Sequence, residues 1–200
     1  VDVVEPTAIV VLNAVDLVID EVTAEAGGER LAATVTLDAG AERATLTFDQ
    51  PLPAGEAVLH LHFRGVLNDK LVGFYRSTFT DDDGVERVLA TTQMEATDGR
   101  RAFPSFDEPI YKATFDVSLM VDQGDTAISN GAQVSDTPGP ETGKHTVSFA
   151  TTPKMSTYLV ALIVGDFVCR SGASDGTAIR VCSTPDKLGL TEFALEATQQ

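Results

Sequence analysis

The sequence predicts an all-β fold, a multi-sheet β-sandwich with the start of one α-helix at its C-terminus. Apolar and polar residues alternate through most of the chain, the pattern of antiparallel strands that are buried on one face. The strand candidates are short and closely spaced, with Gly, Pro and Asp turns between them. Only the last ten residues have the composition of a helix.

Two segments carry the alternation most clearly. Residues 57–64 place Leu59, Leu61 and Phe63 on one face, and residues 112–121 repeat the pattern over a longer stretch. We therefore predict a strand over each segment. The remaining strands are expected over residues 9–12, 16–19, 31–37, 44–48, 73–79, 87–91, 146–149, 158–164 and 179–182.

The segment 191–200 predicts a helix that starts with Thr191 as its N-cap and has acidic residues in its first turn. It reaches Gln200 without a Gly, a Pro or a basic last turn. We expect this helix to continue in a larger protein.

Composition excludes some classes of function. The 200 residues carry 14 Lys and Arg against 30 Asp and Glu, a formal net charge of −16. Nucleic-acid binding needs clustered basic residues, so we expect no nucleic-acid partner. No apolar run is long enough to span a membrane, and residues 1–6 do not resemble a signal peptide, so we expect no membrane association and a cytoplasmic location.

The two cysteines are too few for a disulfide scaffold. Cys169 and Cys182 flank a loop that is typical of a hairpin, which would bring them nearly opposite each other on paired strands. In a reducing compartment we expect two thiols rather than a bond.

The candidates for metal binding are weak. His60 and His62 share one face of a strand, but the third histidine, His145, is far away in sequence, so we predict two solvent-facing imidazoles and no metal site. The run Asp81-Asp82-Asp83-Gly84 lacks the spacing of a calcium loop and is better explained as a solvated hairpin turn.

The densest polar segment, residues 92–109, allows two interpretations. Its arginines and acids fit a loop that ties itself together through Arg–carboxylate bonds, a role suited to Arg100, Arg101, Asp107 and Glu108. Gln93 and Glu95 lie two apart, so on an extended chain they face the same side. A carboxylate beside an amide is suited to binding an ammonium group.

The same segment resembles a known family. Gln93–Pro109, written Q-M-E-A-T-D-G-R-R-A-F-P-S-F-D-E-P, is similar to the Q-F-E-A-T-x-A-R-R-A-F-P-C-W-D-E-P signature of zinc aminopeptidases of the aminopeptidase N and puromycin-sensitive aminopeptidase family. Residues 67–77 resemble its L-N-D-x-L-x-G-F-Y-R-S. Residues 152–167 resemble its T-P-x-M-S-T-Y-L-x-A-F-x-V-G-E-F, and Val11-Leu12-Asn13-Ala14 resembles the segment before its early strands.

The resemblance implies a saddle-like N-terminal β domain. It implies residues 1–186 as this domain, with its first strands missing, and residues 187–200 as a linker and first helix leading into an absent catalytic domain. That domain carries the family's zinc ligands, so this chain is expected to hold no catalytic residue and no zinc and to be inactive alone.

By the same resemblance, Gln93 lines the pocket for the first side chain of a peptide substrate and Glu95 helps to bind its free α-amino group. Met94, Ser105 and Phe106 depart from the signature without touching this pair. Two alternatives stay open: a non-catalytic interaction scaffold or stand-alone β-sandwich binding module, and an epoxide hydrolase with the same β domain. Glu95 argues against the second, because that branch carries Gln there.

Overall fold

The computed structural model describes residues 1–81 and 83–200, and its strands confirm the all-β prediction. These residues form two compact units, each described by itself below. The first unit comprises Val1–Tyr75, Thr92–Thr114 and Pro153–Val160, and the second comprises Arg76–Thr91, Phe115–Thr152 and Ala161–Gln200.

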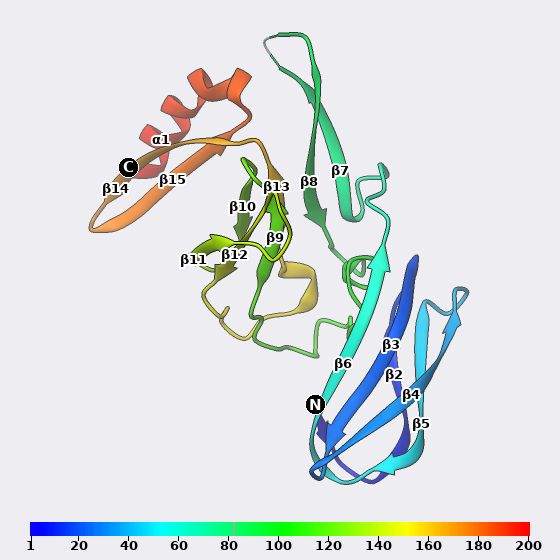
Figure 1. Cartoon of the computed structure of the whole chain (residues 1–200). Coiled ribbons are helices and arrows are strands. Elements are labelled where there is room, and N and C mark those ends of the chain that lie inside the picture. Colours follow the sequence, from blue (N-terminus) through cyan, green and yellow to red (C-terminus); the bar gives the residue numbers. More distant parts are fainter. Residues whose placement is uncertain (82) are drawn as a thin grey trace. The chain divides into compact units, whose positions relative to one another are not determined.

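One antiparallel sheet of six strands dominates the first unit (Figure 1). Its strands in spatial order are β1 (Asp2–Val3), β6 (Gly55–Gly65), β3 (Leu17–Ala26), β4 (Glu29–Asp38), β5 (Arg43–Leu52) and β2 (Thr7–Asn13). Strand β4 pairs with β3 through its first residues, where Ala32 faces Thr23, and with β5 from Ala33 onward. The sheet can therefore curl so that one face encloses a core.

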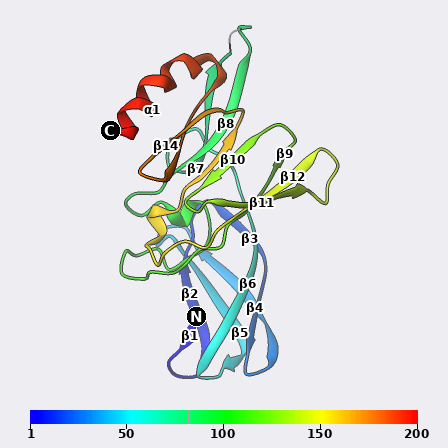
Figure 2. The same cartoon turned by 90° about the vertical axis from the view of Figure 1, so that its left-hand side faces the viewer.

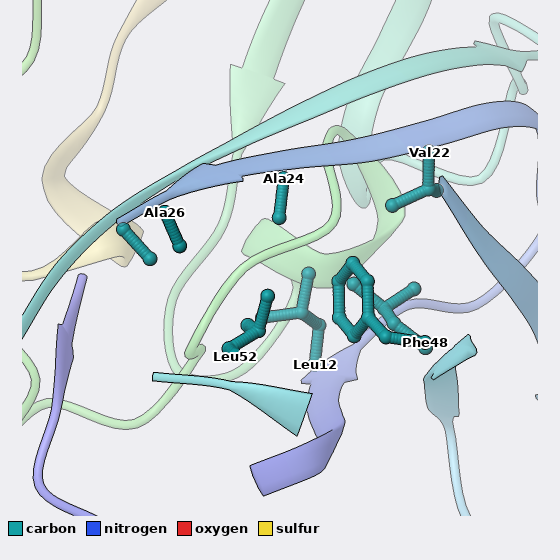
Figure 3. Close-up of a cluster of buried hydrophobic side chains, with 8 residues drawn as sticks. Leu12, Val22, Ala24, Ala26, Phe48 and Leu52 are labelled. Atoms are coloured by element: carbon teal, nitrogen blue, oxygen red, sulfur yellow. The ribbon is translucent and has the colours of Figure 1, made fainter. Parts of the chain in front are cut away.

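The core of the first unit lies on the inner face of this sheet. Figure 3 shows Val22, Ala24 and Ala26 of β3 pointing toward Leu12 of β2 and toward side chains of β5. On β6 the predicted alternation is present, because Leu59, Leu61 and Phe63 are half-buried while the residues between them are exposed. Burial of these apolar side chains supplies most of the stabilisation that a sheet of this kind gains.

The remaining sheets are smaller. A four-stranded sheet has the order β10 (Thr126–Ser129), β13 (Leu162–Gly165), β8 (Glu86–Gln93) and β7 (Gly73–Thr80). A three-stranded sheet has the order β11 (Gln133–Pro138), β12 (Lys144–Phe149) and β9 (Ser118–Asp122). Its core includes Val121, Val147 and Phe149. No helix among the described residues has the length and apolar character needed to cross a membrane.

Two strand predictions were wrong in part. In the segment 112–121 only Ser118–Asp122 is strand, because the residues before it bond to an irregular partner: the amide of Phe115 donates to the Thr152 hydroxyl, a side chain. In the segment 158–164 the first residues belong to a 3-10 turn, Thr157–Leu159, and the strand starts at Leu162. Strands β1, β10, β11 and Val168–Ser174 were not among the predicted strands. In β11 all six residues are exposed and show no alternation.

The cysteines lie in the last hairpin, β14 (Val168–Ser174) and β15 (Thr177–Ser183). The hairpin register places Cys169 opposite Cys182, as expected, but the two form a disulfide. The expectation of two thiols was therefore wrong. It rested on the compartment, whereas the facing positions across the ladder bring the sulfur atoms together.

Helix α1 (Thr191–Gln199) confirms the predicted helix and lies along this hairpin (Figures 1 and 2). The Gln199 side chain donates to the carbonyl of Ala173, and the Ser174 hydroxyl donates to the carbonyl of Gln199. Thr191 is the first helical residue and not the N-cap. A 3-10 segment, Pro185–Leu190, runs directly into the helix, so the Thr191 hydroxyl donates back to the carbonyl of Leu188.

Candidate functional site

The candidate site lies where β8 ends in the first unit. Gln93 is the last residue of β8, and Met94 after it is 2% exposed and anchors the chain in the protein interior. Gln93 and Glu95, on either side of Met94, are both exposed. The peptide bond between Glu95 and Ala96 is cis. The segment thus buries one side chain and presents an amide and a carboxylate to solvent.

Neither of these two polar groups is occupied within the protein. Among residues 1–81 and 83–200, no hydrogen bond or ion pair is made to the Gln93 amide or to the Glu95 carboxylate. The free carboxylate can accept hydrogen bonds from a cation, and the amide can donate or accept. An ammonium group is the ligand that such a pair can bind with charge-assisted hydrogen bonds.

A tight turn follows Glu95 and returns the chain to the protein. The amide of Asp98 donates to the carbonyl of Met94 at 2.9 Å, and a 3-10 turn spans Gly99–Arg101. Gly99 is required by close packing: a Cβ atom at this position would lie 2.8 Å from Oδ1 of Asp107. The turn therefore sits directly against the Asp107 carboxylate.

Asp107 is 1% exposed, so its carboxylate is buried in the protein interior. Its Oδ2 accepts hydrogen bonds from the backbone amide of Arg100 at 3.1 Å and from Nε of Arg100 at 3.0 Å. Its Oδ1 accepts from the hydroxyl of Thr157 at 2.5 Å. A buried carboxylate is tolerated only when it is paired and hydrogen-bonded in this way.

The predicted Arg–carboxylate ties are largely present, with different outer partners. Arg100 bonds Asp107, and Nε of Arg101 bonds Asp98 at 2.8 Å. The exposed Glu108 is not a partner of either arginine in the described part of the chain. Instead, Nη1 of Arg100 donates to Oε2 of Glu42 at 3.0 Å, and Nη1 of Arg101 donates to Oδ2 of Asp16 at 2.5 Å.

Sequence reasoning missed two residues of this network. The side-chain oxygen of Asn13 accepts the backbone amide of Asp107 at 3.1 Å, and Asn13 also exchanges two backbone hydrogen bonds with Ser105. Thr157 closes the other side of Asp107. Both lie in the other stretches that carry the family resemblance, so the signal was present, but spacing alone does not tell which residues meet.

The histidine pair is accounted for by carboxylates. Nε2 of His60 lies 3.5 Å from Glu25, and Nδ1 of His62 lies 3.3 Å from Asp20, which also bonds Arg64. Over residues 1–81 and 83–200, no three His, Cys, Asp or Glu side chains are grouped as metal ligands. We therefore treat both histidines as solvent-facing residues of β6.

The acidic turn after β7 is held by one of its own members. The Asp81 carboxylate accepts the backbone amides of Asp83 and Val85 and bonds Nε of Arg87 at 2.8 Å. These bonds hold the pKa of Asp81 below its usual value, chiefly the one from Arg87. Asp82 lies outside the described residues. This is the hydrogen-bonding pattern of a turn, with the carboxylate already occupied.

His145 lies in the second unit and has hydrogen-bond acceptors at both of its ring nitrogens. Nδ1 lies 2.7 Å from Oδ1 of Asp136, and Nε2 lies 3.1 Å from the carbonyl oxygen of Asp125. Both ring nitrogens face acceptors, and only the protonated imidazole can donate to both. The hydrogen bond to Asp136 is the main cause of a raised pKa of His145, while partial burial opposes it.

This arrangement predicts a pH-dependent contribution to stability. Because the folded-state pKa of His145 is raised, the stabilisation is complete below the ordinary pKa of 6.5 and is lost as the pH rises through the folded value. Below pH 6.5 we expect the free energy of unfolding of the wild type to exceed that of His145→Gln by about 1 kcal/mol at most. The difference is small because Asp136 is 44% exposed and solvent screens the interaction. Urea titrations of both proteins between pH 5.5 and 9 check this, and a difference that grows with pH would contradict it.

Comparisons with known proteins identify the family of the chain. The family described as Peptidase M1 N-terminal domain matches residues 1–159. The chain is 41% identical to "Aminopeptidase 2" of Candida albicans over 98% of its own length and 21% of the relative's. It is 48% identical to "Puromycin-sensitive aminopeptidase" of Caenorhabditis elegans over 69% of its length and 15% of the relative's. It is 36% identical to "Aminopeptidase N" of Acetobacter pasteurianus over 100% of its length and 55% of the relative's.

The family match, over more than half of the chain, defines this all-β chain as a peptidase N-terminal domain. The chain belongs to the Peptidase M1 N-terminal domain family. This confirms the family resemblance predicted from the sequence motifs. The chain spans about a fifth of the length of the first of these relatives and about half of the last.

Proposed function

We propose that this chain is the substrate-anchoring domain of a zinc-dependent aminopeptidase that releases N-terminal residues from peptides. Glu95 holds the α-ammonium group of the substrate, and Gln93 lines the pocket for the first side chain. The observation that carries the proposal is the unpaired, exposed Glu95 beside Gln93, in a loop whose other charged residues are mostly paired. The names of the related proteins, all aminopeptidases, support the same reaction.

The chemistry of an aminopeptidase explains why such a group is needed. An enzyme that cuts next to a free N-terminus must recognise the charge at that end. A carboxylate fixed beside the scissile bond binds the ammonium group and sets the register of cleavage at one residue. Positioning of this kind accounts for a large part of a rate enhancement, because the reacting bond is brought to the catalytic groups in one orientation.

We propose that zinc is held outside this chain, by a catalytic domain to which residues 187–200 lead as a linker and first helix. Among the described residues no three His, Cys, Asp or Glu side chains are grouped as metal ligands. Residues 1–186 then form the β domain. When bound, zinc supplies a Lewis acid and an activated water. The contribution of this chain is binding and orientation, and the chain alone is proposed to hydrolyse nothing. We also propose a cytoplasmic location, as expected from the sequence, although a disulfide such as Cys169–Cys182 is rare in that reducing compartment.

The test uses the full-length protein and the 200-residue chain side by side. We expect the full-length protein to release arylamine from aminoacyl-arylamides, to lose this activity with a zinc chelator and to recover it when zinc is returned. The isolated chain is expected to show no release under the same conditions. A folded, zinc-loaded full-length protein that releases nothing would contradict the proposal and favour an interaction scaffold.

A further inference from the structure

The loop that carries Glu95 is attached to the protein at two places. At its start, the buried Met94 side chain fixes the end of β8, and the Met94 carbonyl accepts the amide of Asp98. At its far end, Gly99 and Arg100 rest on the Asp107 carboxylate. The exposed residues between these attachments are Glu95, Ala96 and Thr97.

The backbone determines where the Glu95 side chain starts. Within the described residues no other side chain bonds it, so nothing holds it directly. The backbone around it is fixed by Met94 on one side and by Asp98 to Arg100 on the other. Arg100 is in turn held by Asp107 through its amide, through Nε and through the Asp107 carbonyl oxygen, which accepts Nη2 at 2.9 Å.

Asp107 ties this far end to two other parts of the first unit. Asn13, at the end of β2, accepts its backbone amide, and Thr157, in the 3-10 turn 157–159, donates to its Oδ1. Segments that are far apart in sequence therefore meet at Asp107, Thr157 at its carboxylate and Asn13 at its backbone amide. A network of this kind has few alternative arrangements, because leaving any of its buried groups unpaired is costly.

We infer that Asp107 is a positioning residue for Glu95. It holds the turn 98–101 in place, and the turn fixes the backbone from which Glu95 reaches a substrate ammonium group. The inference rests on the proposed function of Glu95. A displacement of about 1 Å in a positioned group can cost about 100-fold in rate, so a weakened hold on Asp107 should be measurable at the ammonium site.

The test weakens Asp107 without removing its charge. Thr157→Val removes the hydroxyl that donates to Asp107 and keeps the shape of the side chain, and Thr157→Ser keeps the hydroxyl. The full-length protein is assayed for inhibition by an amino acid amide and by the same amide without its α-amino group. The readout is the inhibition constant of the amide without its α-amino group divided by that of the amino acid amide. A high ratio reports recognition of the ammonium group, and the ratio is insensitive to a general loss of folded protein.

We expect Thr157→Val to lower this ratio about tenfold and Thr157→Ser to leave it close to the wild-type value. In the double variant Thr157→Val with Glu95→Gln, the ratio should be no lower than in Glu95→Gln alone, because both changes act through the same carboxylate. Asn13→Ala removes the acceptor of the Asp107 amide and is expected to lower the ratio in the same way as Thr157→Val. It replaces Thr157→Val in the test if Thr157→Val folds poorly.

The outcomes separate the inference from the proposed function. If Glu95→Gln lowers the ratio but Thr157→Val and Asn13→Ala only lower the melting temperature, Asp107 is structural and the inference fails. Additive effects in the double variant would overturn it as well. If Glu95→Gln itself leaves the ratio unchanged, the role of Glu95 is wrong and the inference fails with it.

Discussion

Replacing Asp107 by alanine is expected to lower the free energy of unfolding of the chain by about 3–5 kcal/mol, the cost of breaking a buried ion pair by removing one partner. Arg100 is only 12% exposed and would keep its charge without its main partner. The Thr157 hydroxyl and the Arg100 amide would also lose their acceptor.

Asp20→Ala is the matched control for this prediction. Asp20 lies in the same unit and also bonds an arginine, Arg64, but Arg64 is 68% exposed and water can replace the lost partner. Exposed ion pairs contribute little to stability, so we expect a much smaller loss. The measurement is urea unfolding followed by circular dichroism for the wild type and both variants. Equal losses in the two variants would show that burial does not make the Asp107 network special.

Much of the fold could be predicted from the sequence, because half-buried strands record their environment in their residues. In β6 the alternation of Leu59, Leu61 and Phe63 with polar residues follows directly from one buried and one exposed face. Strand β11 has no buried face and carries no such record. The segment before β9 has the alternation without the ladder, because its hydrogen-bonding partner is irregular.

The sequence indicated candidate residues for the site but not which distant residues contact them. Gln93 and Glu95 were singled out by their spacing of two, but β8 ends at Gln93 and Glu95 lies in the turn that follows. Two partners of Asp107, Asn13 and Thr157, lie 94 and 50 residues from it in the sequence. Contacts at such separation depend on how the sheets pack, and the sequence alone gives no register between them.

The hairpin of Cys169 and Cys182 illustrates the same limit in a different way. Their facing positions follow from the turn between the strands, so geometry could be predicted. Their oxidation state depends on the redox environment as well as on distance, and the assumption of a reducing compartment led to the wrong expectation.

Glu95→Gln in the full-length protein is expected to lower kcat/KM for peptide substrates by about 100-fold, the size of loss that follows when a positioning contact to the substrate is disturbed. Glutamine keeps the size of the side chain and one acceptor oxygen but loses the negative charge. A substrate ammonium group would still fit beside it, with a weaker and less directional hold. KM should therefore rise and kcat should fall, since the same contact binds the substrate and sets the position of the scissile bond.

Glu108→Gln is the matched control, because Glu108 is another exposed carboxylate of the same loop and is not bonded to Arg100 or Arg101 in the described residues. The substitution removes the same charge thirteen residues further along the chain, so a general effect of charge on the acidic protein would appear in both variants. Steady-state kinetics on aminoacyl-arylamides, with melting temperatures alongside, give the comparison. Equal activity of Glu95→Gln and wild type would remove Glu95 from the substrate site, whereas a loss confined to Glu95→Gln ties recognition of the free N-terminus to this one carboxylate.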